Sequence, residues 1–91
     1  MALSWPPKDP DEVLDYEIDW ALRLDGADTI TTSTWLVPVG ITKDSDSKTT
    51  TTTTIWLSGG TEGTTYSLVN RVVTTQGRTF DQTAKLKLKT K

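Results

Sequence analysis

The residues of this chain that could do chemistry are carboxylates, hydroxyls and tryptophans, because histidine and cysteine are both absent. Without histidine the chain lacks the commonest general base and the commonest zinc ligand. Without cysteine it has no thiolate nucleophile, no disulfide and no cysteine-based metal site. Neither a nucleophile–base pair nor a metal-binding set can be assembled from the remaining residues. We therefore expect no enzyme activity, no metal and no cofactor.

Two pairs of carboxylates have the residue types that act as acid and base in glycoside cleavage. They are Asp9 with Asp11 and Asp15 with Glu17. Nothing around them indicates a cleft or a raised pKa, and capping or solvated positions explain them better. We interpret both pairs as structural.

Two further motifs resemble ligand-binding loops. The sequence DSDS at 44–47 is similar to the start of a calcium loop, but such a loop needs glycine at its sixth position and glutamate at its twelfth. The chain has Thr49 and Ile55 there. The glycine-rich stretch 59–63 is followed by no lysine and no helix, so it is not a phosphate loop. We interpret it as a tight connection whose glycines permit positive backbone dihedral angles.

The tryptophans offer aromatic surfaces for binding. There are four of them, Trp5, Trp20, Trp35 and Trp56. Trp20 is in phase with an inward-facing pattern and is expected in the core. An exposed Trp5 or Trp35 beside polar groups would indicate a carbohydrate-binding module. Trp5 lies in a proline-containing segment, and we expect it to be exposed or to dock onto a partner.

The charges are separated along the chain, although the net charge is only −2 and gives no reason to expect nucleic acid or membrane binding. Eight of the twelve acids fall between Asp9 and Asp28, and four lysines lie at 85, 87, 89 and 91. One interpretation is that these charges form solvated faces at both ends of the chain. Alternatively, the two end strands run side by side, with the lysines facing Asp15, Glu17 and Asp19.

Residues 1–14 are expected to form a leader outside the strands. Trp5-Pro6-Pro7 is predicted to be extended, because proline restricts its own backbone and that of the residue before it. Asp9 as a cap, proline at the next position and Glu12 three residues after the cap predict one helical turn. The leader lacks the basic region and apolar run of a secretory signal, so we expect the protein to stay in a reducing cytoplasm unless a particle carries it out.

From residue 15 onward the pattern is that of strands. Residues 15–24 alternate with period two, which predicts a half-buried strand that ends in a turn at Asp25-Gly26. Residues 39–48 are expected to be a short apolar piece followed by a polar loop. The other expected strands are 29–37 with a bulge near 31–33, the threonine run 49–54 leading into 55–57, then 64–74 and 80–88.

This spacing of strands and turns predicts an all-β fold, an immunoglobulin-like antiparallel β-sandwich of about 6–7 strands over residues 15–91. Gly63 to Tyr66 precedes a strand as the tyrosine corner does in such sandwiches. That motif supports the fold and carries no function.

Two blocks resemble a family of small phage and prophage structural proteins, some of which are fiber-tail adaptors. The blocks are KDPDEVLDYEIDW (Lys8 to Trp20) and WLSGGTEGTTY (Trp56 to Tyr66). The resemblance extends from Trp5 to the last strand, and the long threonine run departs from it. It implies an immunoglobulin-like virion component without known catalysis, made in the host bacterial cytoplasm.

The resemblance leads us to expect a non-enzymatic neck or tail adaptor that binds other virion proteins and forms a homo-oligomer within the particle. A capsid decoration protein and a carbohydrate-binding module are the alternatives. Deleting the leader is expected to leave a folded monomer that no longer assembles. The residues expected to bind a partner are Trp5, Pro6, Pro7, Asp9, Asp11 and Glu12.

Overall fold

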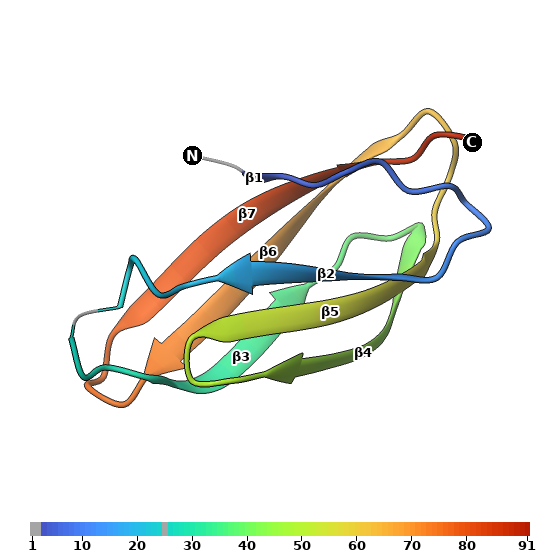
Figure 1. The fold of residues 1–91 in the computed structure, drawn as a ribbon. Helices are drawn as coiled ribbons and strands as arrows, with labels where there is room; N and C mark the ends of the chain where they lie inside the picture. The colour runs from blue at the N-terminus through green and yellow to red at the C-terminus, as the bar shows by residue number, and fades with distance from the viewer. Residues whose placement is uncertain (1–2, 25) are drawn as a thin grey trace.

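The computed structural model describes residues 3–24 and 26–91, and these residues form strands joined by turns and loops (Figure 1). No helix in these ranges is long and apolar enough to cross a membrane. Asp25, half of the expected turn at Asp25-Gly26, lies outside the described residues. The strands are β1 (Leu3–Ser4), β2 (Leu14–Asp19), β3 (Ile30–Leu36), β4 (Ile41–Lys48), β5 (Thr52–Gly59), β6 (Thr65–Thr74) and β7 (Thr79–Lys87).

The strands form two sheets, ordered β1-β7-β6-β3 and β2-β5-β4. The pairing of β1 with β7 is parallel, and the other pairings are antiparallel. With β2 taken as strand B, the sheets contain B, E and D on one side and C, F and G on the other. Apart from β1, which lies beside β7 in the CFG sheet, this is the strand division of immunoglobulin constant domains. The expected all-β sandwich of about 6–7 strands is confirmed.

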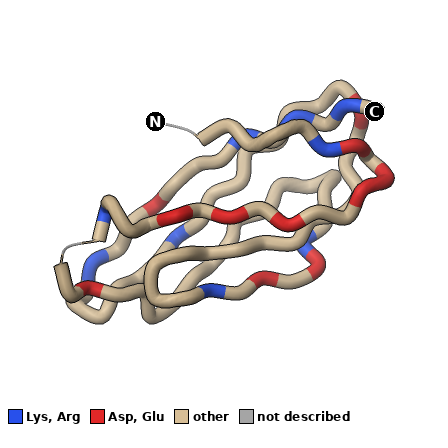
Figure 2. The backbone as a smooth tube through the Cα atoms, in the orientation of Figure 1, with Lys and Arg blue, Asp and Glu red and all other residues tan. Residues whose placement is uncertain are grey.

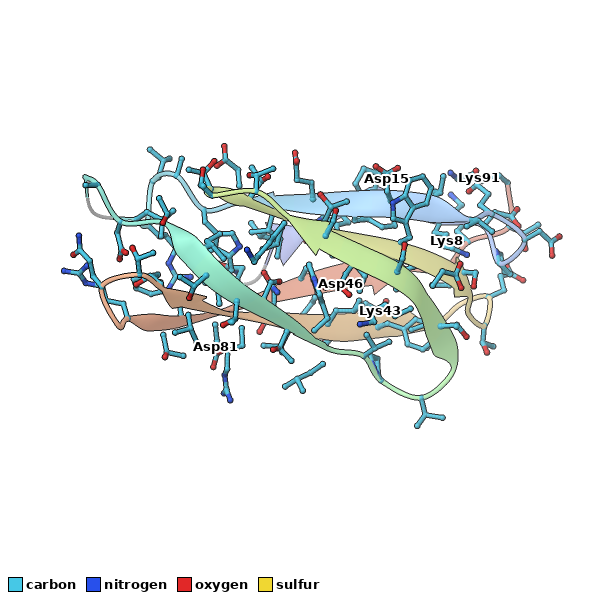
Figure 3. All side chains as sticks on the ribbon, turned by 90° about the horizontal axis from the view of Figure 1, so that it is seen from below. Lys8, Asp15, Lys43, Asp46, Asp81 and Lys91 are labelled. Carbon is cyan, nitrogen blue, oxygen red and sulfur yellow. The ribbon has the colours of Figure 1, made fainter. Side chains whose placement is uncertain are left out.

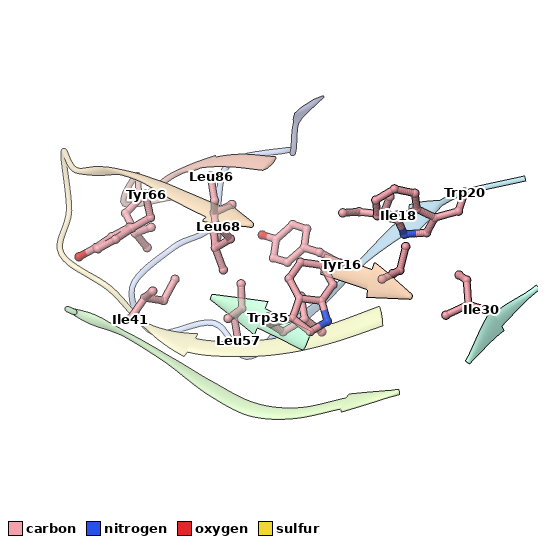
Figure 4. Packing of buried hydrophobic residues seen from close by; sticks show 13 residues of the cluster. Tyr16, Ile18, Trp20, Ile30, Trp35, Ile41, Leu57, Tyr66, Leu68 and Leu86 are labelled. Carbon is pink, nitrogen blue, oxygen red and sulfur yellow. The ribbon is translucent and has the colours of Figure 1, made fainter. Parts of the chain in front are cut away.

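The core lies between the two sheets and is filled from alternate positions of the strands (Figure 4). β6 shows this most regularly, with Tyr66, Leu68 and Val72 buried between exposed or half-buried neighbours. The bulge expected in the second strand is present, because the register of β3 shifts between Ile30 and Thr32. That shift allows Ile30 and Trp35, which have opposite phases in the sequence, to face the same core.

The first predicted strand is too long. β2 ends at Asp19, whose carboxylate accepts a hydrogen bond from the Ala21 backbone N–H (2.9 Å). The backbone N–H groups of Arg23 and Leu24 then donate to the Trp20 carbonyl. The chain therefore turns immediately after Trp20, and Leu22, expected to face inward, is fully exposed.

The expected polar loop within residues 39–48 is also wrong, because this segment is strand β4. β4 is one of the two edge strands of its sheet and, among the described strands, pairs only with β5. An edge strand needs few apolar side chains, so its composition resembles that of a loop, and the register shift between Lys43 and Ser45 hides the alternation further. The threonine run is divided: 49–51 form the β4–β5 turn, and β5 begins at Thr52.

The acids of β2 do not lie beside the lysines of the last strand as hydrogen-bonded neighbours. β2 pairs with β5, so Asp15, Glu17 and Asp19 stand opposite Trp56, Thr54 and Thr52. The lysines of β7 belong to the other sheet, as the separate red and blue positions in Figure 2 show. The prediction that β2 and β7 run side by side is wrong. The strand from the N-terminal region that pairs with β7 is β1.

A buried polar cluster joins the two sheets. The indole N–H of Trp20 donates to Thr53 Oγ1 (3.0 Å) and Asn70 Oδ1 (3.2 Å), and the Thr53 hydroxyl also donates to Asn70 Oδ1 (2.6 Å). The Asn70 amide then donates to Ser33 Oγ and to the Thr34 carbonyl on β3. Because Thr53 lies on β5 and Asn70 on β6, these bonds fix how the sheets face each other.

The tyrosine corner is present at the start of β6. The phenol oxygen of Tyr66 accepts a hydrogen bond from the Thr61 backbone N–H (2.9 Å) and lies 3.4 Å from the Gly40 carbonyl, to which its O–H donates. Gly40 has a φ of 106°, and a Cβ there would lie 2.9 Å from the phenol oxygen. The corner therefore requires glycine at position 40.

The opposite end of the sandwich is held by Asp28, which lies before β3. Its carboxylate accepts hydrogen bonds from the Thr75 hydroxyl (2.9 Å), the Gln76 backbone N–H (3.1 Å) and the Arg78 guanidinium (3.0 Å). These donors belong to the β6–β7 turn. Burial raises the pKa of Asp28, but the hydrogen bonds outweigh it and lower the pKa to about 2.

We predict that Thr53→Val lowers the free energy of unfolding by about 1–2 kcal/mol, because it removes a buried hydroxyl and leaves its partners short of a hydrogen bond. The matched control is Thr54→Val, which alters the half-buried neighbour on the outer face and should change stability by less than about 0.5 kcal/mol. Chemical denaturation of both variants measures the difference. Equal losses at the two positions would contradict the assignment of the cluster.

We also predict an acid-sensitive contribution from Asp28. Its folded pKa of about 2 lies below the ordinary value of 3.8, so its stabilisation is complete above about pH 4 and is lost as the pH falls towards 2. Asp28→Asn should therefore be less stable than the native protein at neutral pH, and the gap should narrow between pH 4 and pH 2. The control is Asp11→Asn at an exposed position. A gap that stays constant from pH 5 to pH 2 would sink the idea.

Candidate protein-binding surfaces

The leader is not a free arm, because it extends the larger sheet along the edge of β7. Leu3 and Ser4 pair in parallel with Ala84 and Lys85. Beyond β1, the Trp5 backbone N–H donates to the Lys85 carbonyl (2.9 Å). The leader contacts the C-terminal region again at Lys8. The Lys8 backbone is hydrogen-bonded to Lys87 and Lys89, the two neighbours of Leu88. The leader, which was expected to contain no strand, therefore contains one short strand and lies along the edge of the sandwich of the same molecule.

Lys8 anchors the leader at this end of the molecule (Figure 3). Its side chain is fully buried, and its ammonium group donates to the carbonyls of Gly59 (2.7 Å) and Asp9 (2.9 Å). Its backbone N–H donates to the Lys87 carbonyl (3.0 Å), and its carbonyl accepts from the Lys89 N–H (2.8 Å). Burial lowers the pKa of Lys8, and the nearby Glu12 and Asp9 carboxylates oppose that shift.

The acidic turn that follows has one of the two hydrogen bonds of a capping box, from the Asp9 backbone to the Glu12 side chain, and does not become a helix. The Asp9 backbone N–H donates to Glu12 Oε1 (2.8 Å), and the Glu12 N–H donates to the Asp9 carbonyl (3.0 Å). Lys91 closes the turn, because its ammonium lies 2.9 Å from Glu12 Oε1 and its backbone N–H donates to Asp9 Oδ2 (2.8 Å). The Lys91 backbone bond is the largest cause of the lowered pKa of Asp9, and the Lys91 side chain lowers that of Glu12. The predicted single turn exists as a hydrogen-bonded turn.

Trp5 is half-buried and packs against the core. Its ring stacks on Tyr16, with centroids 4.7 Å apart and planes 15° from parallel, and lies 6.0 Å from the ring of Trp35. The indole N–H groups of Trp5 and Trp35 are buried without an acceptor among the described residues, so apolar packing holds the pair. Trp35 itself is buried, with 7% of its surface exposed. Neither residue offers the open face that a carbohydrate-binding module would require of it.

The structure thus divides the six residues predicted to bind a partner. Trp5, Asp9 and Glu12 make the contacts that hold the leader in place. The exposed ones are Pro6, Pro7 and Asp11. Val13, not predicted, is also exposed at 57% and follows them along the same edge. We call these four exposed residues the leader edge.

Sequence reasoning missed a second surface, centred on Trp56. This side chain is 41% exposed on the outer face of β5. It stands between Asp15 on β2 and Ser45 on β4. The signal was available, because Ile55 and Leu57 face inward and a strand of period two then points Trp56 outward.

The fold and these surfaces are those of a binding domain. The described residues contain no group of His, Cys, Asp or Glu side chains arranged to hold a metal ion. What they present is an immunoglobulin-like sandwich with an ordered edge and an exposed tryptophan on a sheet face, which are features of a binding domain.

A match to a protein family identifies the chain as a phage structural protein. The family model of the podophage GP4 fiber-tail adaptor protein gp77 matches residues 8–87, and the chain belongs to this family of phage structural proteins. No curated protein matches the chain. Membership makes the protein a virion component of the tail-adaptor class.

We predict that Lys8→Met releases the leader while leaving the sandwich folded. The change keeps most of the aliphatic stem but leaves the Gly59 carbonyl without its donor, which should cost about 1–3 kcal/mol. Hydrogen exchange of the Trp5 and Lys8 amides should become faster. Lys87→Met, at an exposed lysine of the neighbouring strand, is the matched control. Unchanged exchange in Lys8→Met would show that Lys8 is not the anchor.

Proposed function

We propose that this protein is a non-enzymatic adaptor in the neck or tail of the virion, and that it binds a neighbouring virion protein through the leader edge. Membership of the fiber-tail adaptor family supports the adaptor role. In this proposal the protein is made in the host bacterial cytoplasm and enters the particle in several copies.

The observation that supports the leader edge is that exposed side chains project from a backbone fixed on both sides. Before Pro6 and Pro7 the chain is paired with β7, and after them Lys8 is buried. Further along, Asp9 and Glu12 are tied to Lys91. A binding edge that is already ordered loses little conformational freedom when a partner docks, so more of the contact energy appears as affinity.

Point substitutions test this proposal better than deletion of residues 1–14. Deletion would also remove Trp5 from its stack on Tyr16 and Lys8 from its buried site, so a loss of assembly could reflect a loss of folding. Val13→Asp changes an exposed side chain of the leader edge. Val39→Asp is the matched control, because Val39 is fully exposed in the turn between β3 and β4.

We predict that the Val13→Asp protein is incorporated into virions at least tenfold less than the native protein. Each protein is supplied in cells infected by a phage that lacks a functional copy of it. A buried carboxylate without a partner opposes docking at an interface. Quantitative mass spectrometry of purified particles measures incorporation, and denaturation midpoints show that both variants fold. Normal incorporation of Val13→Asp, or equal loss with Val39→Asp, would exclude the leader edge as the docking surface.

The position in the particle is tested by imaging virions that carry a labelled copy. A ring at the neck or tail is the expected result. Many copies spread over the shell would instead identify a capsid decoration protein and overturn the adaptor proposal.

A further inference from the structure

The outer faces of the two sheets carry opposite charges. In Figure 3, Asp15 projects on the side of β2 and β5, whereas Asp81 projects on the opposite side, where β6 and β7 lie. We define the acidic face as the outer side of β2-β5-β4 and the lysine face as the outer side of β7-β6-β3.

The acidic face has a row of carboxylates on β2. Asp15, Glu17 and Asp19 are exposed at alternate positions. On β4, Asp44 accepts a hydrogen bond from Ser58 of β5 (2.9 Å). The remaining outward positions of the described strands are hydroxyls and Trp56, and the strand registers place no lysine or arginine among them. Neither Asp15 nor Glu17 forms an ion pair within the described chain.

The lysine face has the matching row of ammonium groups on and after β7. Lys85, Lys87 and Lys89 are exposed at alternate positions, between the buried Leu86 and Leu88. No ion pair to these lysines occurs within the described chain. The acid on this face, Asp81, is already neutralised by Arg71 of β6, with contacts of 2.8 and 3.1 Å.

The two charged rows lie on corresponding edges of the sandwich. β2 lies over β7, because Trp20 at the end of β2 stacks on Phe80 of β7 with ring centroids 6.3 Å apart. At the other edge β4 contacts β3. A second copy placed against the acidic face in the same orientation therefore brings its β7 towards β2 of the first. Both rows repeat every second residue of a strand, so their charges have the same spacing.

Each face also exposes an apolar side chain in the sheet that carries its charged row. On the acidic face this is Trp56, directly opposite Asp15. On the lysine face it is Leu36, 55% exposed on β3 and paired with the half-buried Val69 of β6. Tryptophan is the residue most often found at the energetic centre of an interface, while ion pairs at a rim add little affinity but fix orientation.

The size of the faces is adequate for association. The Cα trace extends 42 × 24 × 19 Å, so an elliptical face along the long axis covers roughly 600–800 Å², close to what each partner contributes to a standard interface.

We propose that the acidic face of one copy binds the lysine face of the next, with Trp56 packing near Leu36. The contact uses different surfaces on the two partners, so it leaves one free face at each end of a pair. It therefore builds a ring if the rotation between copies closes, or a filament if it does not. This inference does not depend on what the leader edge binds.

The test uses two face variants, Asp15→Lys with Glu17→Lys and Lys85→Glu with Lys87→Glu, measured by sedimentation over a range of concentrations at low salt. Native protein should associate beyond the dimer and dissociate as salt is added. Each face variant alone should lose at least tenfold in affinity, because both of its faces then carry the same sign. An equimolar mixture of the two should associate again. Trp56→Thr should lose at least tenfold as well.

Glu62→Lys and Lys48→Glu serve as controls, because they reverse exposed charges outside both rows, and they should associate as the native protein does. Three outcomes would overturn the proposal. They are a native protein that stays monomeric at millimolar concentration, association that stops at a dimer, and face variants that fail to recover on mixing. Loss of virion incorporation by Trp56→Thr in a strictly monomeric protein would assign the acidic face to a different virion protein.

Discussion

The arrangement of this molecule depends on one buried ammonium group. Lys8 carries a full charge away from water, and such a group is tolerated only where hydrogen-bond acceptors replace the solvent. Here the acceptors are the carbonyls of Gly59, at the end of β5, and of Asp9. The backbone of Lys8 is bonded at the same time to Lys87 and Lys89. One residue thus joins the leader, the smaller sheet and the end of the larger sheet.

The glycine corner next to Lys8 shares this constraint. Gly59 and Gly60 have φ of 72° and 100°, and a Cβ at Gly60 would lie 2.7 Å from the side chain of Leu88. Only glycine fits at position 60 while Leu88 stays buried. The corner in turn holds the Gly59 carbonyl towards Lys8. The glycine-rich stretch 59–63, which resembles a ligand-binding loop, therefore supplies a hydrogen-bond acceptor to Lys8 of the same chain.

Much of the sandwich could be predicted from the sequence, because alternation is strong wherever one side of a strand faces the core. β6 and β7 follow this rule, and so does β2 up to Trp20. Prediction failed where burial does not control composition. β4 is a polar edge strand, and the end of β2 depends on the bond from Ala21 to Asp19.

The binding surfaces were harder to predict for a related reason. Lys8 reads as a solvated charge, and only the three-dimensional structure brings Gly59, 51 residues away in sequence, to its side chain. Trp5 reads as an exposed aromatic because the rings it contacts, those of Tyr16 and Trp35, lie on strands of different sheets. Trp56, by contrast, was predictable from its phase alone. Contacts between distant segments leave no local pattern.

The contact between the leader and the end of the chain has a consequence for synthesis. Asp9 and the Lys91 backbone are 82 residues apart in sequence, and β1 pairs with β7, which is made after the other described strands. During synthesis β1 must therefore wait, unpaired, until β7 has emerged. A chain interrupted before β7 can form neither the β1–β7 pairing nor the backbone hydrogen bonds of Lys8 to Lys87 and Lys89. The leader edge is therefore ordered only on chains that include β7, so the fold distinguishes chains that contain this strand from chains that lack it.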